Sequence, residues 1–240
     1  EQHAVGFASG LATAGRKPVV AVCSTFLQRA NDQLFHEIAL QELPVVFCLD
    51  RAGMVGNDGV SHNGSFDIAY LRYLPHFVLM APRDGRELQM MLRWAVQADQ
   101  PTAVRYPRDN VPAGDDSEQR PPIEPGRAEI VREGENVLLW CYGVTTNLAM
   151  VAADQLQKEH QISPTIVNAR FAKPMDTHTL AELLESHDLL VTLEDHALAG
   201  GFGSAVVESM VDKGLSASQV HRLGIPDRFI NHAPRTDQLD

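Results

Sequence analysis

The stretch Leu43–Asp67 reads L-P-V-V-F-C-L-D-R-A-G-M-V-G-N-D-G-V-S-H-N-G-S-F-D. Its first part, Leu43–Leu49, is a short apolar run that predicts a buried strand. Three glycines, Gly56, Gly59 and Gly64, then permit backbone angles that other residues avoid, so we expect the polar remainder to be a shaped loop. A polar loop directly after a core strand is a common place for chemistry in an α/β protein.

Segments typical of strands and helices alternate on both sides of this loop. Short apolar runs predict strands, and apolar residues at helical spacing predict helices. This alternation indicates an α/β fold in which a mostly parallel sheet carries helices on both faces. In order, we expect a helix at Glu1–Gly15, a strand at Val19–Cys23, a helix at Phe26–Gln41, a strand at Pro44–Leu49, a helix at Phe66–Leu74, a strand at Phe77–Met80, a helix at Arg83–Ala98 and a strand at Thr102–Arg105.

The character of the sequence changes near residue 109. Residues 109–126 contain four prolines and two glycines and show no apolar periodicity, which is typical of a linker. We therefore predict a first domain at 1–110, a linker at 111–126 and a smaller α/β domain at 127–240. In the smaller domain we expect strands at Val137–Cys141, Thr165–Val167 and Leu189–Leu193, and helices near Asn147–His160, Thr177–His187 and Phe202–Val211.

The composition narrows the classes of partner. The chain has 31 acidic and 20 basic residues, a net charge of −11 and no basic run, so we expect no nucleic-acid partner. No apolar run approaches the roughly 18–20 residues that a membrane span needs, so we expect no membrane partner either. Cys23, Cys48 and Cys141 are odd in number and far apart, which indicates reduced thiols in a cytoplasmic protein instead of disulfides or a zinc site.

His62 is the first candidate for chemistry within the loop. It lies between Gly59 and Gly64, four residues after Asp58. The residues alone leave two interpretations open: the ring hydrogen-bonds to the loop backbone, or it transfers protons, for which histidine is well suited near neutral pH. A metal site at Asp58, His62 and Asp67 is disfavoured because these residues share no rigid element at ligand spacing, and we name no metal ligand.

Arginines near the ends of two predicted strands form a second candidate feature. Arg29 lies in the first turn of the helix that follows Val19–Cys23, and Arg105 and Arg108 belong to V-R-Y-P-R at the end of another strand. Ligands of α/β folds bind at the carboxyl ends of strands, where a guanidinium suits a phosphate. Arg29 alone could lie on a solvated helix face, but the coincidence at two strand ends favours a phosphorylated ligand.

Six longer motifs run in order along almost the whole chain: E-Q-H-A-V-G-F-A-S-G-L-A from Glu1, S-T-F-L-Q-R-A-N-D-Q from Ser24, L-D-R-A-G-M-V-G-N-D-G-V-S-H-N-G-S-F-D from Leu49, V-R-Y-P-R from Val104, A-R-F-A-K-P-M-D from Ala169 and E-D-H-A-L-A-G-G-F-G-S from Glu194. Together they closely resemble the 1-deoxy-D-xylulose-5-phosphate synthase family of transketolase-like enzymes. The resemblance implies a pyrimidine-binding domain followed by a C-terminal domain. It also implies a transferase that uses thiamin diphosphate and Mg²⁺.

The resemblance also implies a reaction. Members of the family join pyruvate to D-glyceraldehyde 3-phosphate and release CO2, and their product feeds isoprenoid, thiamin and pyridoxal synthesis. The family further suggests a cytoplasmic homodimer. By resemblance, Glu1 is the glutamate that hydrogen-bonds N1′ of the cofactor aminopyrimidine, and Phe26 is the aromatic residue that stacks on that ring.

The resemblance assigns four residues to the substrates. His62 matches the active-site histidine near the reacting carbon, and Asp58 matches a neighbouring polar contact for substrate. Arg29 and Arg108 match the arginines that hold the phosphate of the aldehyde, in agreement with the argument from strand ends. Cys23 departs from the family, which commonly has tyrosine before S-T-F, so one substrate-side contact differs here.

Part of the family pattern is missing from these residues. The chain begins at Glu1 without methionine and stops at Asp240 without a closing element, so we interpret it as a piece of a longer polypeptide. The G-D-G…N signature for Mg²⁺ and the diphosphate is expected on the missing N-terminal domain, and we expect the piece alone to be inactive. The alternatives are another transketolase-like carboligase, the β-subunit of a 2-oxoacid dehydrogenase, or a non-catalytic module that retains the pyrimidine-type domain.

Overall fold

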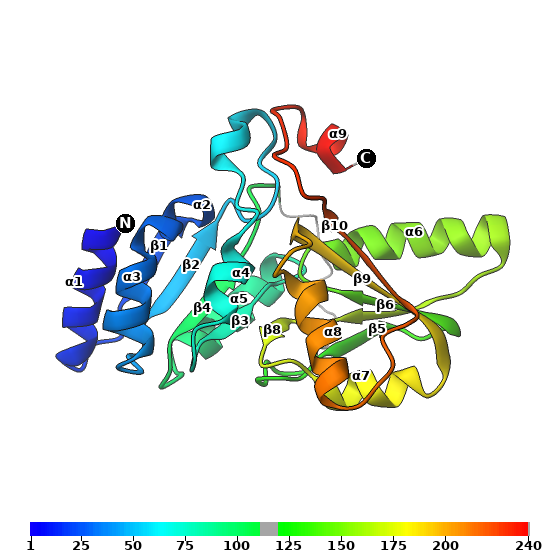
Figure 1. The fold of residues 1–240 in the computed structure, drawn as a ribbon, viewed down its shortest axis with the longest axis horizontal. Coiled ribbons are helices and arrows are strands. Elements are labelled where there is room, and N and C mark those ends of the chain that lie inside the picture. Colours follow the sequence, from blue (N-terminus) through cyan, green and yellow to red (C-terminus); the bar gives the residue numbers. More distant parts are fainter. Residues whose placement is uncertain (111–119, 240) are drawn as a thin grey trace.

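The computed structural model describes residues 1–110 and 120–239, which form two α/β units next to each other (Figure 1). The sheet of the first unit has the strand order β1-β2-β4-β3-β8. Its first four strands are parallel, and β8 pairs antiparallel with β3 at one edge. These strands are β1 (Val19–Cys23), β2 (Val46–Asp50), β4 (Thr102–Arg105), β3 (Val78–Met80) and β8 (Phe171–Lys173).

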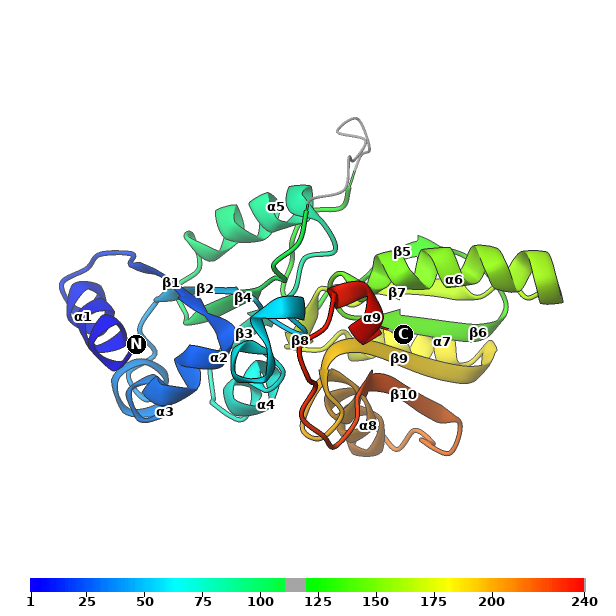
Figure 2. The same ribbon diagram turned by 90° about the horizontal axis from the view of Figure 1, so that it is seen from above.

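Helices cover both faces of this first sheet (Figure 2). Figure 2 shows α5 (Gly85–Ala95) on one face, with α1 (Gln2–Thr13), α3 (Asn31–Gln33) and α4 (Asp67–Arg72) on the other. Strand β2 divides its side chains between two buried apolar clusters: Phe47 and Leu49 join one, and Val46 and Cys48 join the other. Successive side chains of a strand point to opposite faces, so an uninterrupted apolar run is what a doubly covered strand requires.

The predicted helix at Phe26–Gln41 starts two residues earlier and changes its winding along its length. It consists of α2 (Ser24–Leu27), η1 (Gln28–Ala30), α3 and η2 (Leu34–Ala39), of which η1 is a 3₁₀ turn and η2 is π-helical. The apolar stripe is nevertheless buried, with Leu27, Leu34 and Ile38 fully inaccessible to solvent. The stripe therefore sets the face that packs on the sheet, while the local winding is not regular.

The second unit contains a five-stranded sheet in the order β10-β9-β6-β7-β5. Its neighbouring pairs are parallel except β5 with β7. Figure 1 shows α6 on one face and α7 and α8 on the other. The strands are β5 (Glu129–Arg132), β6 (Asn136–Cys141), β7 (Thr165–Asn168), β9 (His187–Ala197) and β10 (Val220–Ile225), and the helices are α6 (Thr145–His160), α7 (Thr177–Leu184), α8 (Phe202–Asp212) and α9 (Arg235–Leu239).

The structure confirms the predicted α/β class and corrects several elements. Sequence reasoning missed β5, β8, β10 and α9, and it extended the helix at Thr177 as far as His187, which instead begins β9. Strand β8 lies within the predicted second domain but completes the first sheet, because Phe171 is fully buried with Met80 and Met91. Of the predicted linker, residues 111–119 lie outside the described residues, and Ile123 packs into the same cluster.

A buried polar network joins the two units. The Glu87 carboxylate on α5 accepts hydrogen bonds from Arg170 Nε at 2.7 Å and from Asn168 Nδ2 at 2.9 Å, and Arg170 Nη2 lies 3.2 Å from Glu129. Glu87 and Arg170 have at most 1 % of their side chains exposed. Burial raises the pKa of Glu87 above its ordinary value, and Arg170 opposes that rise. The Arg170 guanidinium thus bridges two buried carboxylates, and Arg83 Nη2 lies 3.6 Å from the second of them, Glu129.

Replacing Arg170 with methionine is expected to reduce the free energy of unfolding by about 3–5 kcal/mol, because removal of one partner leaves buried charges uncompensated. Urea denaturation followed by circular dichroism measures this change. The matched control is Arg132→Met, because Arg132 pairs with an Asp154 side chain that is 73 % exposed. That control should cost no more than about 1 kcal/mol. Equal effects of the two substitutions would contradict a structural role for the network.

Candidate functional site

The candidate site lies at the carboxyl ends of the parallel strands of the first sheet. The helical run α2–η2 follows β1, the glycine loop follows β2, and the segment with Arg108 follows β4. Because β1 and β4 both pair in parallel with β2, all three connections leave the same edge of the sheet. The fold therefore brings together the segments that the sequence predicts to carry chemistry.

The glycine loop is closed at its base by a backbone pair. Gly53 and Gly64 exchange two hydrogen bonds of 2.8 Å each. Gly56 and Gly59 have φ angles of 68° and 83°, in the left-handed region that favours glycine. Gly64 is required for a different reason, since a Cβ there would lie 2.4 Å from the Arg51 carbonyl oxygen. Between these points the chain forms two 3₁₀ turns, η3 (Gly56–Asp58) and η4 (Val60–His62), which present Asp58 and His62.

His62 lies against Phe26. The two ring centroids are 5.3 Å apart with an interplanar angle of 70°, an edge-to-face arrangement. Nδ1 of His62 lies 3.1 Å from the Ser61 hydroxyl, and its backbone N–H donates to the Gly59 carbonyl. The ring is half-buried and is therefore within reach of a bound molecule.

Arg29 links Phe26 to Glu1. The guanidinium carbon of Arg29 lies 4.8 Å from the Phe26 ring centroid, a cation–π contact, and Nη1 lies 3.4 Å from a carboxylate oxygen of Glu1. The Arg29 side chain is 61 % exposed. Glu1, Arg29, Phe26 and His62, which span 62 residues of sequence, thus form one continuous line of contacts.

Asp58 and Arg108 form a second group of contacts, which joins the glycine loop to the segment after β4. Arg108 Nη1 donates to Asp58 Oδ2 at 2.5 Å, and Arg51 Nε lies 3.5 Å from the same oxygen. The hydrogen bond from Arg108 holds the pKa of Asp58 below its ordinary value. A pocket of about 500 Å³ adjoins Arg108, lined by residues of both units that include Tyr106 and Leu148.

Arg51 is a member of this group that sequence reasoning missed. It bonds to Asp50 as well as to Asp58, and its Nη1 lies 3.8 Å from the sulfur of Cys23. Arg51 has a φ of 56°, in the left-handed region, directly after β2. An arginine at the carboxyl end of a strand was the available signal, the same one that selected Arg108. Cys23 therefore places a thiol beside a guanidinium; burial raises the pKa of this thiol.

For Arg105, the prediction that an arginine at a strand end binds a phosphate is wrong. Its side chain is buried, donates to Asp67 from Nε at 3.0 Å and donates to the Asp195 carbonyl from Nη2 at 2.9 Å. It cannot meet a phosphate, because inward-facing strand residues alternate with outward-facing ones and Arg105 points into the structure. Asp67 is occupied by the same pair, and the described residues contain no group of three or more His, Cys, Asp or Glu side chains that could hold a metal ion.

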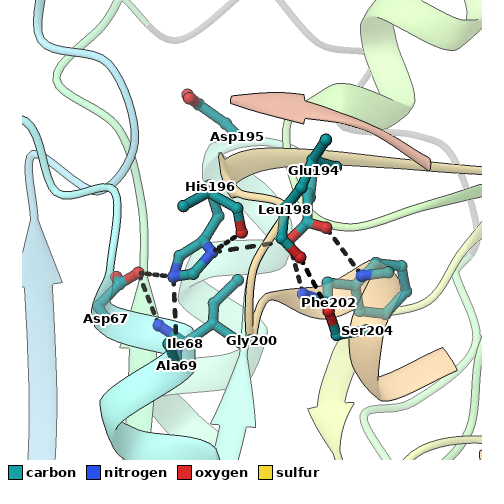
Figure 3. Close-up of polar contacts among 12 residues, drawn as sticks. Asp67, Ile68, Ala69, Glu194, Asp195, His196, Leu198, Gly200, Phe202 and Ser204 are labelled. Carbon is teal, nitrogen blue, oxygen red and sulfur yellow. Dashed lines mark hydrogen bonds and ion pairs between the residues drawn. The ribbon is translucent and has the colours of Figure 1, made fainter. Parts of the chain in front are cut away.

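The motif that begins at Glu194 lies next to Asp67, where the second unit meets the first (Figure 3). The carboxylate of Glu194 accepts hydrogen bonds from the backbone N–H groups of Phe202 at 2.5 Å and Gly203 at 2.8 Å, at the start of α8. Burial raises the pKa of Glu194 to about 7. A Cβ on Gly201 would lie 2.1 Å from this carboxylate, which explains the glycine at that place in the motif.

His196 lies in the same junction but is fully buried. Nδ1 lies 2.7 Å from the Ala197 carbonyl oxygen, and Nε2 lies 3.4 Å from the backbone N–H of Ala69 (Figure 3). These contacts define the neutral tautomer with the proton on Nδ1. Burial lowers the pKa of His196 to about 4, so the ring is uncharged at neutral pH. His196 therefore connects β9 to α4, whereas His62 is half-buried on the glycine loop.

Comparison with known proteins identifies both units. A family model described as the transketolase pyrimidine binding domain matches residues 1–113, and one described as the transketolase C-terminal domain matches residues 126–240. A solved structure titled as the inactive beta4 tetramer of a split gene transketolase superposes with a TM-score of 0.88 at 29% identity, covering 98% of this chain and 75% of that one. Transketolase from Campylobacter jejuni superposes with a TM-score of 0.75 at 18% identity over 97% of this chain and 35% of that one, which supports the fold alone.

The chain belongs to the transketolase family, of which it carries the pyrimidine-binding and C-terminal domains. Within that family, its sequence is 50% identical over 100% of its length to a protein of Synechococcus sp. (strain JA-2-3B'a(2-13)) named 1-deoxy-D-xylulose-5-phosphate synthase. A protein of Geobacter sulfurreducens named 1-deoxy-D-xylulose-5-phosphate synthase 1 is 50% identical over 98% of the chain. The chain spans 37% of the length of each of these relatives. These matches confirm the resemblance stated from the six motifs.

Proposed function

We propose that the chain is the pyrimidine-binding and C-terminal part of a thiamin-diphosphate-dependent transferase. The complete enzyme condenses pyruvate with D-glyceraldehyde 3-phosphate to 1-deoxy-D-xylulose 5-phosphate and CO2, for isoprenoid, thiamin and pyridoxal biosynthesis. The observation that carries the proposal is the contact line from Glu1 through Arg29 and Phe26 to His62. It combines a carboxylate, an aromatic ring and an imidazole at the ligand-binding edge of the sheet.

The residues present fit one half of the cofactor. An aminopyrimidine needs a carboxyl group that shares a proton with a weakly basic ring nitrogen, and a flat apolar surface against the ring. Glu1 supplies the first and Phe26 the second, and Arg29 contacts both of these side chains. When bound, thiamin diphosphate supplies the carbon nucleophile that attacks the keto acid. We assign the Mg²⁺ and diphosphate contacts to the other half of the enzyme.

The remaining site residues suit the two substrates. Arg29, with its mostly exposed guanidinium, and Arg108 provide donors for the three phosphate oxygens of the aldehyde. Asp58 is held in place by Arg108 and Arg51 and can accept a hydrogen bond from a substrate hydroxyl. His62 moves protons to and from the oxygen atoms of the reacting carbons, because its ring is accessible and adjoins Phe26.

Assembly with a second chain follows from the proposal. Large apolar side chains are exposed on α1, on η2 and directly after η2: Phe7 at 63 %, Phe35 at 40 % and Leu40 at 68 %. Such a surface is suited to a protein interface, which supports the homodimer expected from the family. No helix within residues 1–110 and 120–239 is long and apolar enough to cross a membrane. The three free cysteines support placement of the enzyme in the cytoplasm.

We propose further that the chain alone is inactive, because only one wall of the cofactor site lies on it. The solved relative described as an inactive beta4 tetramer supports this view for a chain of similar extent. Among the alternatives, another transketolase-like carboligase receives support from the same relative, which is named as a split gene transketolase. The match of 50% to proteins named as the synthase favours the synthase.

Isothermal titration calorimetry tests the division of the cofactor site. Titrating thiamin diphosphate with Mg²⁺ into the 240-residue chain is expected to give no saturable binding, whereas the complete enzyme should bind tightly. A second titration into the complete enzyme with Glu1→Gln should show weaker binding, since one neutral amide replaces the carboxylate. Tight binding by the isolated chain would show that the missing half is not needed to hold the cofactor.

A further inference from the structure

The C-terminal segment Ile230–Leu239 crosses over the glycine loop, far from it in sequence. In Figure 1, α9 lies at the top of the molecule beside the loop that carries η3 and η4. A Cβ on Gly56 would lie 3.2 Å from the backbone nitrogen of Arg235, so the two segments pack backbone to backbone there. The loop is thus covered by a part of the second unit that none of the motifs predicts.

Arg235 binds three segments at once. Nε donates to the Met54 carbonyl at 3.0 Å, Nη2 donates to Asp195 at 2.8 Å, and Nη1 donates to Asp109 at 2.9 Å. Met54 begins the glycine loop, Asp195 lies on β9, and Asp109 directly follows Arg108. The side chain is only 18 % exposed. A planar guanidinium with fixed donor directions imposes one relative geometry on the three segments.

Three successive amides at the start of the loop depend on side chains for their hydrogen bonds. The N–H of Met54 donates to Asp195 Oδ1 at 3.0 Å, that of Val55 to Asn63 Oδ1 at 3.1 Å, and that of Gly56 to Gln238 Oε1 at 2.9 Å. These backbone N–H groups bond to side chains and not to other backbone groups of the loop. The conformation of the loop therefore depends on those side chains. Two of the three acceptors belong to the second unit.

The same segment holds the far end of the loop. Asn63 Nδ2 donates to the Ile230 carbonyl at 3.0 Å, and Gln238 Nε2 donates to the Asn231 carbonyl at 2.8 Å, which braces Gln238 itself. Asp58 and His62 lie between these two anchored ends. Their positions are therefore coupled to the C-terminal segment, although neither side chain bonds to it in the described structure.

We infer that Arg235 is a positioning residue, which together with Gln238 sets the loop that carries Asp58 and His62 relative to Arg108. Arg235 contacts none of the atoms assigned to the reaction. It acts through Met54 on the loop and through Asp109 on the arginine segment. The inference about geometry stands on the contacts alone, and its consequence for catalysis rests on the proposed function.

Hydrogen–deuterium exchange on the 240-residue chain tests the geometric part without any assay of activity. Arg235→Met and Gln238→Met should accelerate exchange of peptides covering Met54–Asn63 by about tenfold or more, since charge-assisted hydrogen bonds are lost or their support is removed. Peptides of the second sheet should keep their wild-type rates. The control is Arg228→Met, an exposed arginine two residues before this segment. Wild-type exchange of the loop in Arg235→Met would overturn the inference.

Kinetics of the complete enzyme test the catalytic part. Arg235→Met should lower kcat by about 10- to 100-fold, because a small misplacement of reacting groups has effects of this size. Arg235→Lys, which keeps one charge but not the three fixed donors, should recover little, and guanidinium ion added to Arg235→Ala should restore part of kcat. An accelerated exchange with unchanged kcat would overturn the positioning role. If instead the wild-type complete enzyme formed no product, the proposed function would fail while the exchange result still stood.

Discussion

Replacing His62 with alanine in the complete enzyme is expected to lower kcat by about 10²- to 10⁴-fold, the usual contribution of a positioned acid–base group. The ring adjoins Phe26 and the line of contacts that ends at Glu1, so its loss removes the imidazole from that line. The fold should be unaffected, because the His62 side chain is half-buried and its hydrogen bond is to the hydroxyl of the neighbouring Ser61.

The measurement for His62 is a steady-state assay of product formation, with thermal unfolding recorded in parallel. His178→Ala serves as the matched control, since its side chain is 82 % exposed on α7 and remote from the loop in sequence. That control should keep wild-type kcat and wild-type thermal midpoint. Unchanged turnover in His62→Ala would remove His62 from the mechanism. The other interpretation, a ring that only hydrogen-bonds within the loop, would then hold.

The second large effect concerns the phosphate of the aldehyde. Arg108→Ala is expected to raise KM for D-glyceraldehyde 3-phosphate by about 10- to 100-fold, because a hydrogen bond to a charged group contributes roughly 1.5–3 kcal/mol. KM for pyruvate should change less than about threefold, since pyruvate has no phosphate for a guanidinium to bind. Arg29→Ala should act in the same direction and also weaken cofactor binding, because Arg29 contacts both Phe26 and Glu1.

The contrast between two arginines of one motif sharpens this test. Arg105 and Arg108 are three residues apart, yet Arg105 is buried against Asp67 while the Arg108 side chain is 55 % exposed. Arg105→Lys should therefore destabilise the fold, with little effect on the ratio of the two KM values. If Arg108→Ala raised both KM values equally, the assignment of Arg108 to the phosphate would be wrong.

The strands and the shape of the loop could be predicted because they depend on local sequence. The apolar run of β2 is buried on both faces, and the glycines of the loop lie where left-handed angles or close backbone approach require them. The candidates His62 and Arg29 came from the loop and from the strand ends, whereas Glu1 and Phe26 came from the family motifs. Parallel pairing then explains how segments so far apart in the chain reach one edge.

The remaining features depend on contacts between distant parts of the chain. Strand β8 has only three residues and is stabilised by packing of Phe171 against the first sheet, which no local pattern announces. Arg105 was misassigned because its partner, Asp67, lies 38 residues away. The bonds of Arg235 to Met54 and of Gln238 to Gly56 span 181 and 182 residues, so the C-terminal cover of the loop appears only in three dimensions.

The most direct test of the proposed function is the product of the complete enzyme. The enzyme that contains this chain should be incubated with pyruvate, D-glyceraldehyde 3-phosphate, thiamin diphosphate and Mg²⁺, and the products should be measured by mass spectrometry with ¹³C-labelled pyruvate. We predict 1-deoxy-D-xylulose 5-phosphate carrying the labelled two-carbon unit, together with an equal amount of CO2. Transfer of a two-carbon unit from a ketose phosphate without release of CO2, or no reaction of pyruvate at all, would contradict the proposal.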